Sequence, residues 1–252
     1  MRFFYSGISD LPLASIPEYS FISASRLWKR KTGFHVKNWI LDSGAFTEIS
    51  RLGHYAHSVN QYAELIKRFQ PNGCLQAAVA QDYMCEPFIL KKTSLSTQEH
   101  QKRTVENYVQ LCNKISDTYV MPVLQGYAPE DYVACIELYG PLLRPNAWVG
   151  VGSVCKRNTR IQDIFQLLYA IQQNRPDLRL HGFGLKKSAL EDDFIRNALH
   201  TSDSMAWCYA ARKTGERKTK AFLIEHLNKQ IREIETLILR KQTAGFFTDG
   251  RR

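Results

Sequence analysis

Short apolar runs recur along the 252 residues and alternate with longer segments of helical pattern. Most of these runs are almost continuously hydrophobic, as expected of strands that are buried on both faces. The alternation therefore predicts a parallel sheet whose strands are joined by helical crossovers. Eight strands are predicted, near Phe3–Ile8, Ser20–Ala24, Trp39–Asp42, Leu75–Gln81, Tyr119–Gln125, Ala147–Gly152, Arg179–Gly184 and Ser202–Trp207.

Helical patterns fill most of the gaps between the predicted strands. They cover Val59–Phe69, Ser96–Ile115, a segment that opens at Pro129, Ile161–Gln173, Ala189–Leu199 and Glu216–Gln242. Eight such repeats favour a (β/α)8 barrel over an open, doubly wound sheet, and no G-x-G-x-x-G follows a strand. The first two connections are too short or irregular for full helices. We expect one domain, 1–252, with an α/β barrel that is irregular in its first two units and a C-terminal helix at about 216–242.

Polar side chains follow several of the apolar runs, at the point where each run ends. Asp42, Asp82 and Gln125 do so, and Ser153, Lys186 and Asp203 belong to the same set. In a barrel these positions meet at the mouth where catalytic groups lie. Three carboxylates leave two chemistries open. One is an oxygen-ligand site for a hard cation, and the other is carboxylate catalysis at a sugar carbon.

The bulk composition bears on partners and metals. The formal net charge is +10 and the basic residues are clustered, which favours a polyanionic partner such as nucleic acid. Six cysteines occur without a C-x-x-C pair, so a compact thiolate zinc site is not expected. We predict no bound metal and no cofactor.

With no secretory signal and no apolar stretch of about 20 residues, we also predict a cytoplasmic protein without a membrane partner.

The strand-end motifs resemble those of the tRNA-guanine transglycosylases. L-D-S-G-A-F at 41–46 resembles their D-S-G-G-F, and A-Q-D-Y-M-C-E-P at 80–87 is similar to F-D-E-C-x-P. V-L-Q-G at 123–126 resembles V-Q-G, G-F-G at 182–184 resembles M-G-V-G, and S-D-S-M at 202–205 is similar to the segment with the nucleophile. The matches are collinear from about residue 40 to 215.

The resemblance implies a role for each matched residue. Asp203 would be the nucleophile that forms a glycosyl-enzyme intermediate, and Asp42 would be the general acid and base. A guanine-like base would be held by Asp82 and Gln125, by the backbone around Gly150 and by neighbouring residues of the same motifs. Those neighbours are Ser43, Gly126 and Tyr83, and either Tyr83 or Met84 would stack on the base.

The departures from the family indicate the substrate. The zinc motif C-x-C-x-x-C…H and the P-T-R segment after the nucleophile are both missing, and the chain is much shorter than the tRNA enzymes. It is more similar to the DpdA-type DNA transglycosylases of phages and modification islands. This implies exchange of guanine in DNA for a free 7-deazaguanine, such as 7-cyano-7-deazaguanine or a related precursor. The same chemistry on tRNA, and a non-catalytic nucleic-acid-binding subunit, are the alternatives.

Basic residues lie in the loops that follow the later strands. In a barrel these loops surround the mouth, so we expect them to contact phosphates. The residues are Lys156, Arg157, Lys186, Lys187, Arg212 and Lys213.

Overall fold

The computed structural model describes residues 1–6, 12–208 and 219–244, and side chains up to residue 239. Within these ranges every paired strand is parallel to its neighbours, in the order β5-β4-β3-β2-β1-β9-β8-β7-β6. The strands are β1 (Arg2–Ser6), β2 (Tyr19–Ser23), β3 (Asn38–Asp42), β4 (Cys74–Val79), β5 (Val120–Met121), β6 (Val123–Leu124), β7 (Trp148–Val151), β8 (Arg179–Gly182) and β9 (Leu199–Ser204).

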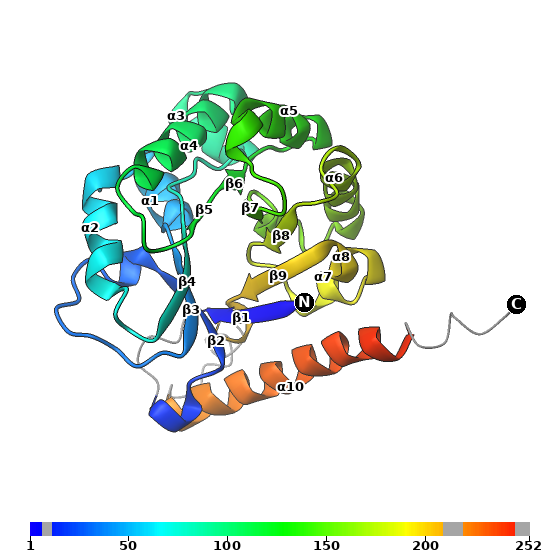
Figure 1. Ribbon diagram of the computed structural model, residues 1–252. Helices are drawn as coiled ribbons and strands as arrows, with labels where there is room; N and C mark the ends of the chain where they lie inside the picture. The colour runs from blue at the N-terminus through cyan, green and yellow to red at the C-terminus, as the bar shows by residue number, and fades with distance from the viewer. Residues whose placement is uncertain (7–11, 209–218, 245–252) are drawn as a thin grey trace, which may run out of the picture.

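The sheet curves into a ring that closes at β5 and β6 (Figure 1). These two short strands are halves of one extended segment, which the sequence predicts as a single strand. Val120 and Met121 pair with β4, whereas Val123 and Leu124 pair with β7. Pro122 lies between them, has no N–H to donate, and accepts a hydrogen bond from the Gly150 N–H at 2.8 Å. One segment therefore joins both ends of the sheet, and the prediction of an α/β barrel is confirmed.

Helices surround the ring of strands (Figure 1). They are α1 (Ala45–Leu52), α2 (Val59–Phe69), α3 (Pro87–Thr93), α4 (Thr97–Cys112), α5 (Pro129–Tyr139), α6 (Ile161–Asn174), α7 (Lys187–Leu190), α8 (Asp193–Ala198) and α10 (Lys220–Ala244). Single 3-10 turns lie at η1 (Leu13–Ser15), η2 (Ala24–Arg26), η3 (Gly140–Leu142) and η4 (Cys155–Arg157). In the described residues the first two connections hold only η1 and η2, as the sequence predicts.

Alternate side chains of the strands face the barrel interior and the surrounding helices. Phe4 packs inside with Phe21, Ile40 and residues of β4, β5 and β7. Its neighbours Phe3 and Tyr5 face outward into a different cluster. This period of two is the expected consequence of the pleat.

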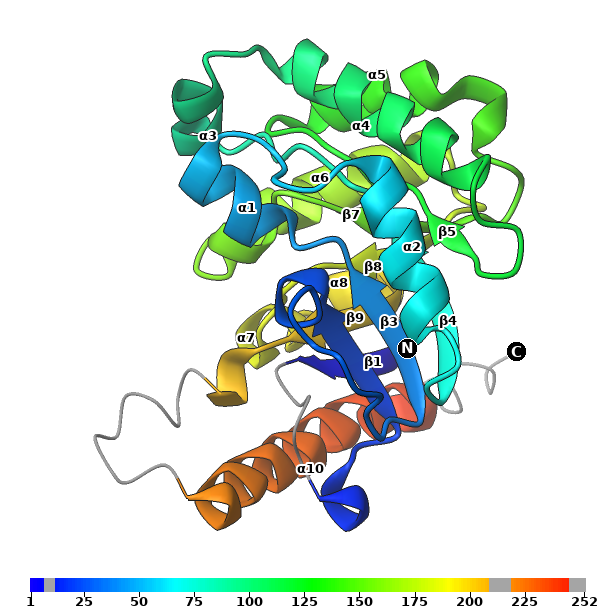
Figure 2. The same cartoon turned by 90° about the vertical axis from the view of Figure 1, so that its left-hand side faces the viewer.

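Helix α10 covers the outside of the barrel beside β1, where the early connections supply no long helix (Figures 1 and 2). Leu227, Ile234 and Leu237 of α10 join Phe3 and Tyr5 in one buried cluster. The prediction of a long C-terminal amphipathic helix is confirmed, with bounds shifted by a few residues. None of the helices in the described ranges is both long and apolar enough to span a membrane.

Two predicted elements near the end of the barrel are wrong. The expected helix Ala189–Leu199 is two short helices, because Asp192 caps α8 by accepting from the Ile195 N–H at 3.0 Å. The last strand is Leu199–Ser204 and not Ser202–Trp207. Polar side chains in β9 interrupt the apolar pattern, so the sequence does not indicate where this strand begins. Thr201, for example, is buried and accepts from the Trp148 indole at 2.7 Å.

Candidate active site

A cavity of about 160 Å³ opens at the carboxyl ends of the strands. The sequence predicts that Asp42, Asp82, Gln125 and Asp203 meet at this mouth, and all four line the cavity. Because the strands are parallel, each one delivers its last side chains to the same end of the barrel. The remaining lining residues are Phe21, Ala45, Phe46, Met84, Glu86, Gly152, Ser153, Cys155, Phe183 and Gly184.

Asp203 is held from both sides in what we call the Asp203 cradle, formed by Ser6, the Gly184 N–H and His181. The Ser6 hydroxyl donates to Oδ2 at 2.8 Å, and the Gly184 N–H donates to Oδ1 at 2.9 Å. His181 is fully buried, and its Nε2 lies 3.4 Å from Oδ1. Its Nδ1 lies 2.8 Å from the Thr201 hydroxyl. These contacts fix the orientation of a buried carboxylate that faces the cavity.

Asp42 has a different environment. Burial raises the pKa of the Asp42 carboxyl from 3.8 to about 7, against a hydrogen bond from Ser23, and the charges of Asp82 and Asp203 raise it further. The Gly44 N–H donates to Oδ2 at 3.2 Å. Gly44 has a φ of 82°, which glycine adopts without the penalty that a side chain would bring. A carboxyl that titrates near neutrality can both give and accept a proton there.

Asp82 begins a chain of hydrogen-bonded side chains that we call the polar row, made of Asp82, Gln125, Ser153 and Glu86. The Gln125 amide donates to Asp82 Oδ2, and the Ser153 hydroxyl lies 2.9 Å from Gln125 Oε1 and 3.0 Å from Glu86 Oε2. Burial raises the pKa of Asp82 to about 6, against hydrogen bonds from Gln125 and Ser43. The row presents acceptors and donors along one wall of the cavity.

The other walls are apolar and closely packed. Phe21 and Phe183 lie with ring centroids 6.0 Å apart, and Met84 is buried nearby in the lining. A Cβ on Gly152 would lie 2.2 Å from the Gln125 amide nitrogen, so only glycine leaves room for that amide. A small flat molecule with a polar edge would fit such a cavity.

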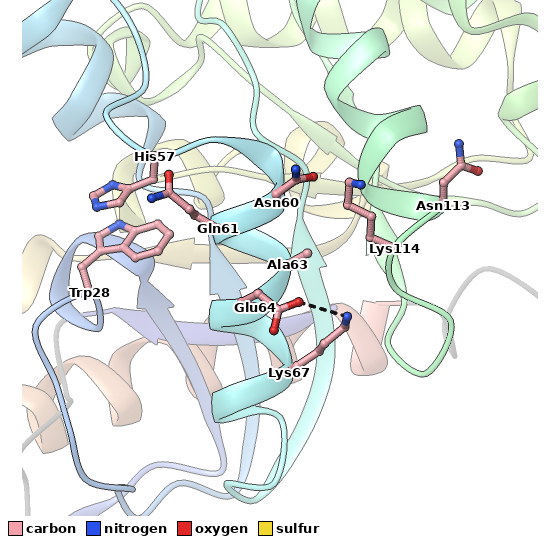
Figure 3. Close-up of a pocket in the computed structure, with 9 residues that line it drawn as sticks. All are labelled: Trp28, His57, Asn60, Gln61, Ala63, Glu64, Lys67, Asn113 and Lys114. Atoms are coloured by element: carbon pink, nitrogen blue, oxygen red, sulfur yellow. Dashed lines mark hydrogen bonds and ion pairs between the residues drawn. The ribbon is translucent and has the colours of Figure 1, made fainter.

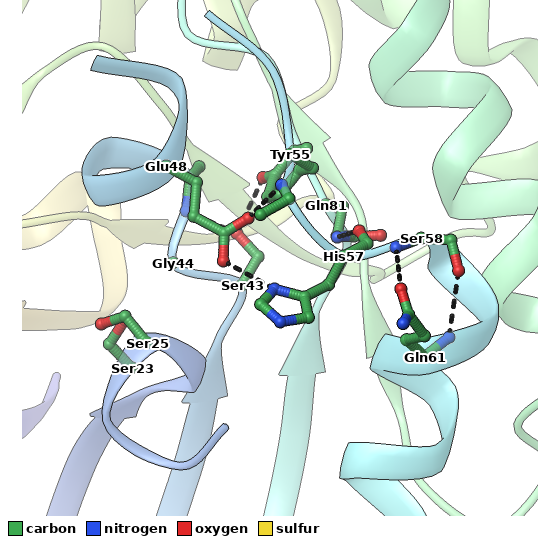
Figure 4. Close-up of polar contacts among 12 residues, drawn as sticks. Ser23, Ser25, Ser43, Gly44, Glu48, Tyr55, His57, Ser58, Gln61 and Gln81 are labelled. Carbon is green, nitrogen blue, oxygen red and sulfur yellow. Dashed lines mark hydrogen bonds and ion pairs between the residues drawn. The ribbon is translucent and has the colours of Figure 1, made fainter. Parts of the chain in front are cut away.

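The loop between α1 and α2 contacts Asp82 of the polar row. The Tyr55 hydroxyl donates to the Asp82 carbonyl at 2.9 Å and lies 3.2 Å from Ser43, which donates to Asp82 Oδ1. Figure 4 shows Glu48 on α1 facing this loop, where it accepts from the Ala56 N–H at 2.8 Å and contacts His57 Nδ1 at 3.2 Å. Glu48 therefore holds in place the loop that carries Tyr55.

A second and larger hollow, of about 810 Å³, lies on the outer side of the barrel beside α2. Trp28 stacks on His57 there, with ring centroids 3.7 Å apart, and Lys67 pairs with Glu64 (Figure 3). Helix side chains form most of its lining, and no residue predicted for the site from the sequence lies in it.

Four residues predicted to bind the substrate lie outside the cavity lining. The Gly150 N–H donates to the Pro122 carbonyl within the sheet, and Gly150 packs under the Phe183 ring. Gly126 packs against Asp131. Tyr83 lies edge-on to Tyr55 and His100, and its neighbour Met84 lines the cavity instead. Ser43 contributes through its hydrogen bond to Asp82 and is not itself in the lining.

The contributors that the sequence analysis missed include Ser6, Phe21, Glu86, His181 and Phe183. Ser6 ends β1, so the rule that found Asp42 could have found it too. Glu86 lies in the loop before α3, and His181 lies within β8, so neither carries a strand-end signal.

The predicted phosphate-binding residues differ in their surroundings. Lys156 and Lys186 are exposed, and Lys156 Nζ lies 4.8 Å from the ring centroid of Phe46 at the cavity rim. Arg157 is buried and donates to the backbone carbonyls of Ser153 and Tyr127, so the expectation of a phosphate contact does not fit it. Lys187 pairs with Glu233 of α10 at 3.4 Å. Arg212 and Lys213 fall outside the described residues.

Across the described ranges, no group of three or more His, Cys, Asp and Glu side chains is arranged to hold a metal ion. The expectation of a metal-free protein stays a prediction.

The chain is similar to a known protein family. The model of the family described as DpdA, deoxypurine in DNA protein A, matches residues 3–220. That range includes every residue of the cavity lining. No curated protein matches the chain.

Proposed function

The chain belongs to the DpdA family, and from that membership and the geometry of its cavity we propose that it exchanges guanine in DNA for a 7-deazaguanine. The observation that supports this most directly is the joint lining of one small cavity by Asp203, Asp42 and the polar row. A nucleophile, a proton carrier and a reader of a base edge are the three parts that such an exchange needs.

The polar row is suited to the guanine edge. An ionised Asp82 accepts from the N1–H and the exocyclic amine, which are both donors, and the Gln125 amide can donate to O6. Phe21, Phe183 and Met84 would lie against the faces of the base, where apolar contact replaces stacking in DNA. The base is thereby held with its glycosidic bond toward Asp203 and Asp42.

The exchange then takes two displacements at the sugar. A carboxylate oxygen of Asp203 bonds to C1′ as the bond from C1′ to N9 breaks, and the electron pair leaves with guanine. Protonated Asp42 gives its proton to the departing base. A 7-deazaguanine replaces guanine, loses its N9 proton to ionised Asp42, and attacks C1′. The bond from C1′ to Asp203 breaks, and both carboxyl groups return to their starting forms.

A base within a duplex does not reach a cavity at the barrel mouth, so the target nucleotide must be flipped out of the helix. This costs a few kcal/mol. Lys156 and Lys186 are exposed near the mouth and would offset part of this cost through phosphate contacts.

The test uses DNA whose guanine bases carry a radioactive label. The protein is incubated with this DNA and with a mixture of free 7-deazaguanines that differ at position 7. Labelled guanine should be released, and a deazaguanine nucleoside should appear when the DNA is digested. A parallel reaction with labelled tRNA distinguishes the nucleic acid, and Asp203→Asn is the control. Failure to release guanine from DNA would refute the proposal.

A further inference from the structure

The imidazole of the Asp203 cradle is hydrogen-bonded to residues of the neighbouring strands. His181 on β8 is the register partner of Thr201 on β9, and its Nδ1 lies 2.8 Å from the Thr201 hydroxyl. The Trp148 indole on β7 donates to the same hydroxyl at 2.7 Å. All three side chains are buried. They form a hydrogen-bonded chain that ends beside the Asp203 carboxylate.

The hydrogen bonds of Thr201 bear on where the His181 proton lies. An indole N–H can only donate, so the Thr201 oxygen accepts from Trp148 and has one proton of its own to give. Among the described residues, the only other hydrogen-bond partner of this hydroxyl is His181 Nδ1. When Thr201 donates to Nδ1, a neutral imidazole has its own proton on Nε2, the nitrogen that faces Asp203.

The other neutral tautomer is unfavourable at both ends of the ring. With the proton on Nδ1, the Thr201 hydroxyl would have no acceptor within the described part of the chain, and the Nε2 lone pair would lie 3.4 Å from a carboxylate oxygen. An unpaired buried donor and two facing acceptors both cost free energy. A doubly protonated ring would keep the Nε2–H but would again leave Thr201 without an acceptor. The surroundings therefore favour a neutral His181 whose N–H is directed at Asp203.

This N–H is available for a stronger contact than the structure shows. The 3.4 Å between Nε2 and Asp203 Oδ1 exceeds the ~2.7–3.2 Å of a well-formed N–H···O hydrogen bond, and Nε2 has no such bond within the described ranges. Phe21 stacks on the imidazole with centroids 5.4 Å apart, and Phe183 meets it edge-on at 4.8 Å, so the ring is held in place. Because an unpaired buried donor is unfavourable, a small movement of the carboxylate toward Nε2 would be stabilised.

We infer that Thr201 is a positioning residue for the nucleophile and that it acts through His181. Its hydroxyl proton keeps the imidazole in the tautomer with the N–H toward Asp203, and this N–H pairs with Oδ1 when the carboxylate attacks C1′. Catalytic hydrogen bonds are often long in the free enzyme and shorten in the reacting complex. The carboxylate is then oriented by donors from Ser6, Gly184 and His181. The inference rests on the proposed function, since it takes Asp203 as the nucleophile.

The first test locates the proton without any substrate. The histidine rings are isotopically labelled, and their nitrogen NMR signals are recorded above neutral pH, where an ordinary imidazole is neutral. The His181 signals are identified by their absence in His181→Gln. These signals distinguish a protonated ring nitrogen from a bare one. We expect a protonated Nε2 and a bare Nδ1. A proton on Nδ1, with or without one on Nε2, would overturn the inference.

Two substitutions separate the Thr201 hydroxyl from its packing. Valine has a similar shape without the hydroxyl, whereas serine keeps the hydroxyl and loses a methyl group. At saturating DNA, the rate of adduct formation in rapid-quench experiments should fall about tenfold in Thr201→Val, roughly the effect of one lost hydrogen bond. It should stay close to the wild-type rate in Thr201→Ser. The KM for the incoming base should be the same in both, because the polar row is unchanged. An unchanged rate in Thr201→Val, or an equal loss in Thr201→Ser, would contradict the assigned role.

A double variant distinguishes this role from a merely structural one. If Thr201 acts through His181, adding Thr201→Val to His181→Gln should slow adduct formation no further. A further tenfold loss would mean that Thr201 supports the site independently of the imidazole. Circular dichroism checks that each variant folds. If Thr201→Val does not fold, the position of the proton in the wild-type protein still decides.

The two levels of the proposal fail differently. If the wild-type protein neither forms the adduct nor releases guanine from DNA, the transglycosylase function itself is wrong, whichever nitrogen of His181 has the proton. If it does both, and either the proton lies on Nδ1 or Thr201→Val keeps the wild-type rate, only the inference about Thr201 is wrong.

Discussion

The two sides of the cavity are built in different ways. The polar row consists of four side chains that are joined by hydrogen bonds to one another, so the protons in these hydrogen bonds can rearrange. In the Asp203 cradle a backbone N–H and a strand-end hydroxyl donate to one carboxylate, and a fully buried imidazole lies 3.4 Å from it. The difference suggests that base choice and bond formation are separable. Changes in the row should alter which base is used, and changes around Asp203 should alter how fast any base is exchanged.

The largest effect is expected for Asp203→Asn. This change keeps the size of the side chain but removes the nucleophilic carboxylate, so no covalent bond to C1′ can form. Both base exchange and a denaturant-stable adduct between protein and DNA should disappear, as seen by denaturing gel electrophoresis. Circular dichroism checks that the variant folds. Exchange at nearly the wild-type rate would show that the nucleophile is a different residue.

A smaller loss is expected for Asp42→Asn, which removes proton transfer and leaves the nucleophile in place. Such a loss typically slows a reaction by ~10²–10⁴-fold. Exchange should slow by this order, while some covalent adduct should still accumulate on the gel. If the adduct disappears as completely as in Asp203→Asn, the two aspartates do not have separate roles.

The sequence predicts Asp42 and Gln125 as site residues for a physical reason. Both follow nearly continuous apolar runs, and the alternation of those runs with helical patterns also predicts the barrel. The rest depends on contacts between distant segments. Glu86 and Ser153 are 67 residues apart and meet only because the loop before α3 folds over the end of β7. His181 and Thr201 are polar residues that pair with each other on the adjacent strands β8 and β9, and they interrupt the apolar pattern that marks a strand.

The pH dependence of exchange should follow the two carboxyl groups whose pKa is raised, those of Asp82 and Asp42. Asp82 must be ionised to accept from the base, so activity should rise as the pH increases through its pKa of about 6. Asp42 must be protonated to release guanine, so activity should fall as the pH increases through its pKa of about 7. The rate of exchange against pH should be bell-shaped with a narrow maximum. Asp42→Asn should lose the alkaline limb, and a persistent alkaline limb would assign that titration to another group.

His181→Gln tests whether the Asp203 cradle and the polar row have separate roles. The substitution removes the imidazole beside Asp203 Oδ1, and we expect adduct formation to slow by roughly tenfold because the carboxylate is less well oriented. The preference among 7-substituted bases should stay as in the wild-type protein, since the polar row is untouched. Rapid-quench measurement of adduct formation and base competition test the two parts. A changed preference with an unchanged rate would contradict the division between the sides.

The smallest effect concerns the exposed lysines, where two neighbours make a matched pair. Lys186 is exposed near the mouth, whereas Lys187 pairs with Glu233 of α10 at 3.4 Å. If Lys186 contacts a phosphate, Lys186→Gln should lower the slope of log binding constant against log salt by about 0.9 on duplex DNA. Lys187→Gln should change the slope less, because its charge is already partly neutralised. The slopes are measured by fluorescence anisotropy, and equal reductions would mean that the ion pair with α10 opens when DNA binds.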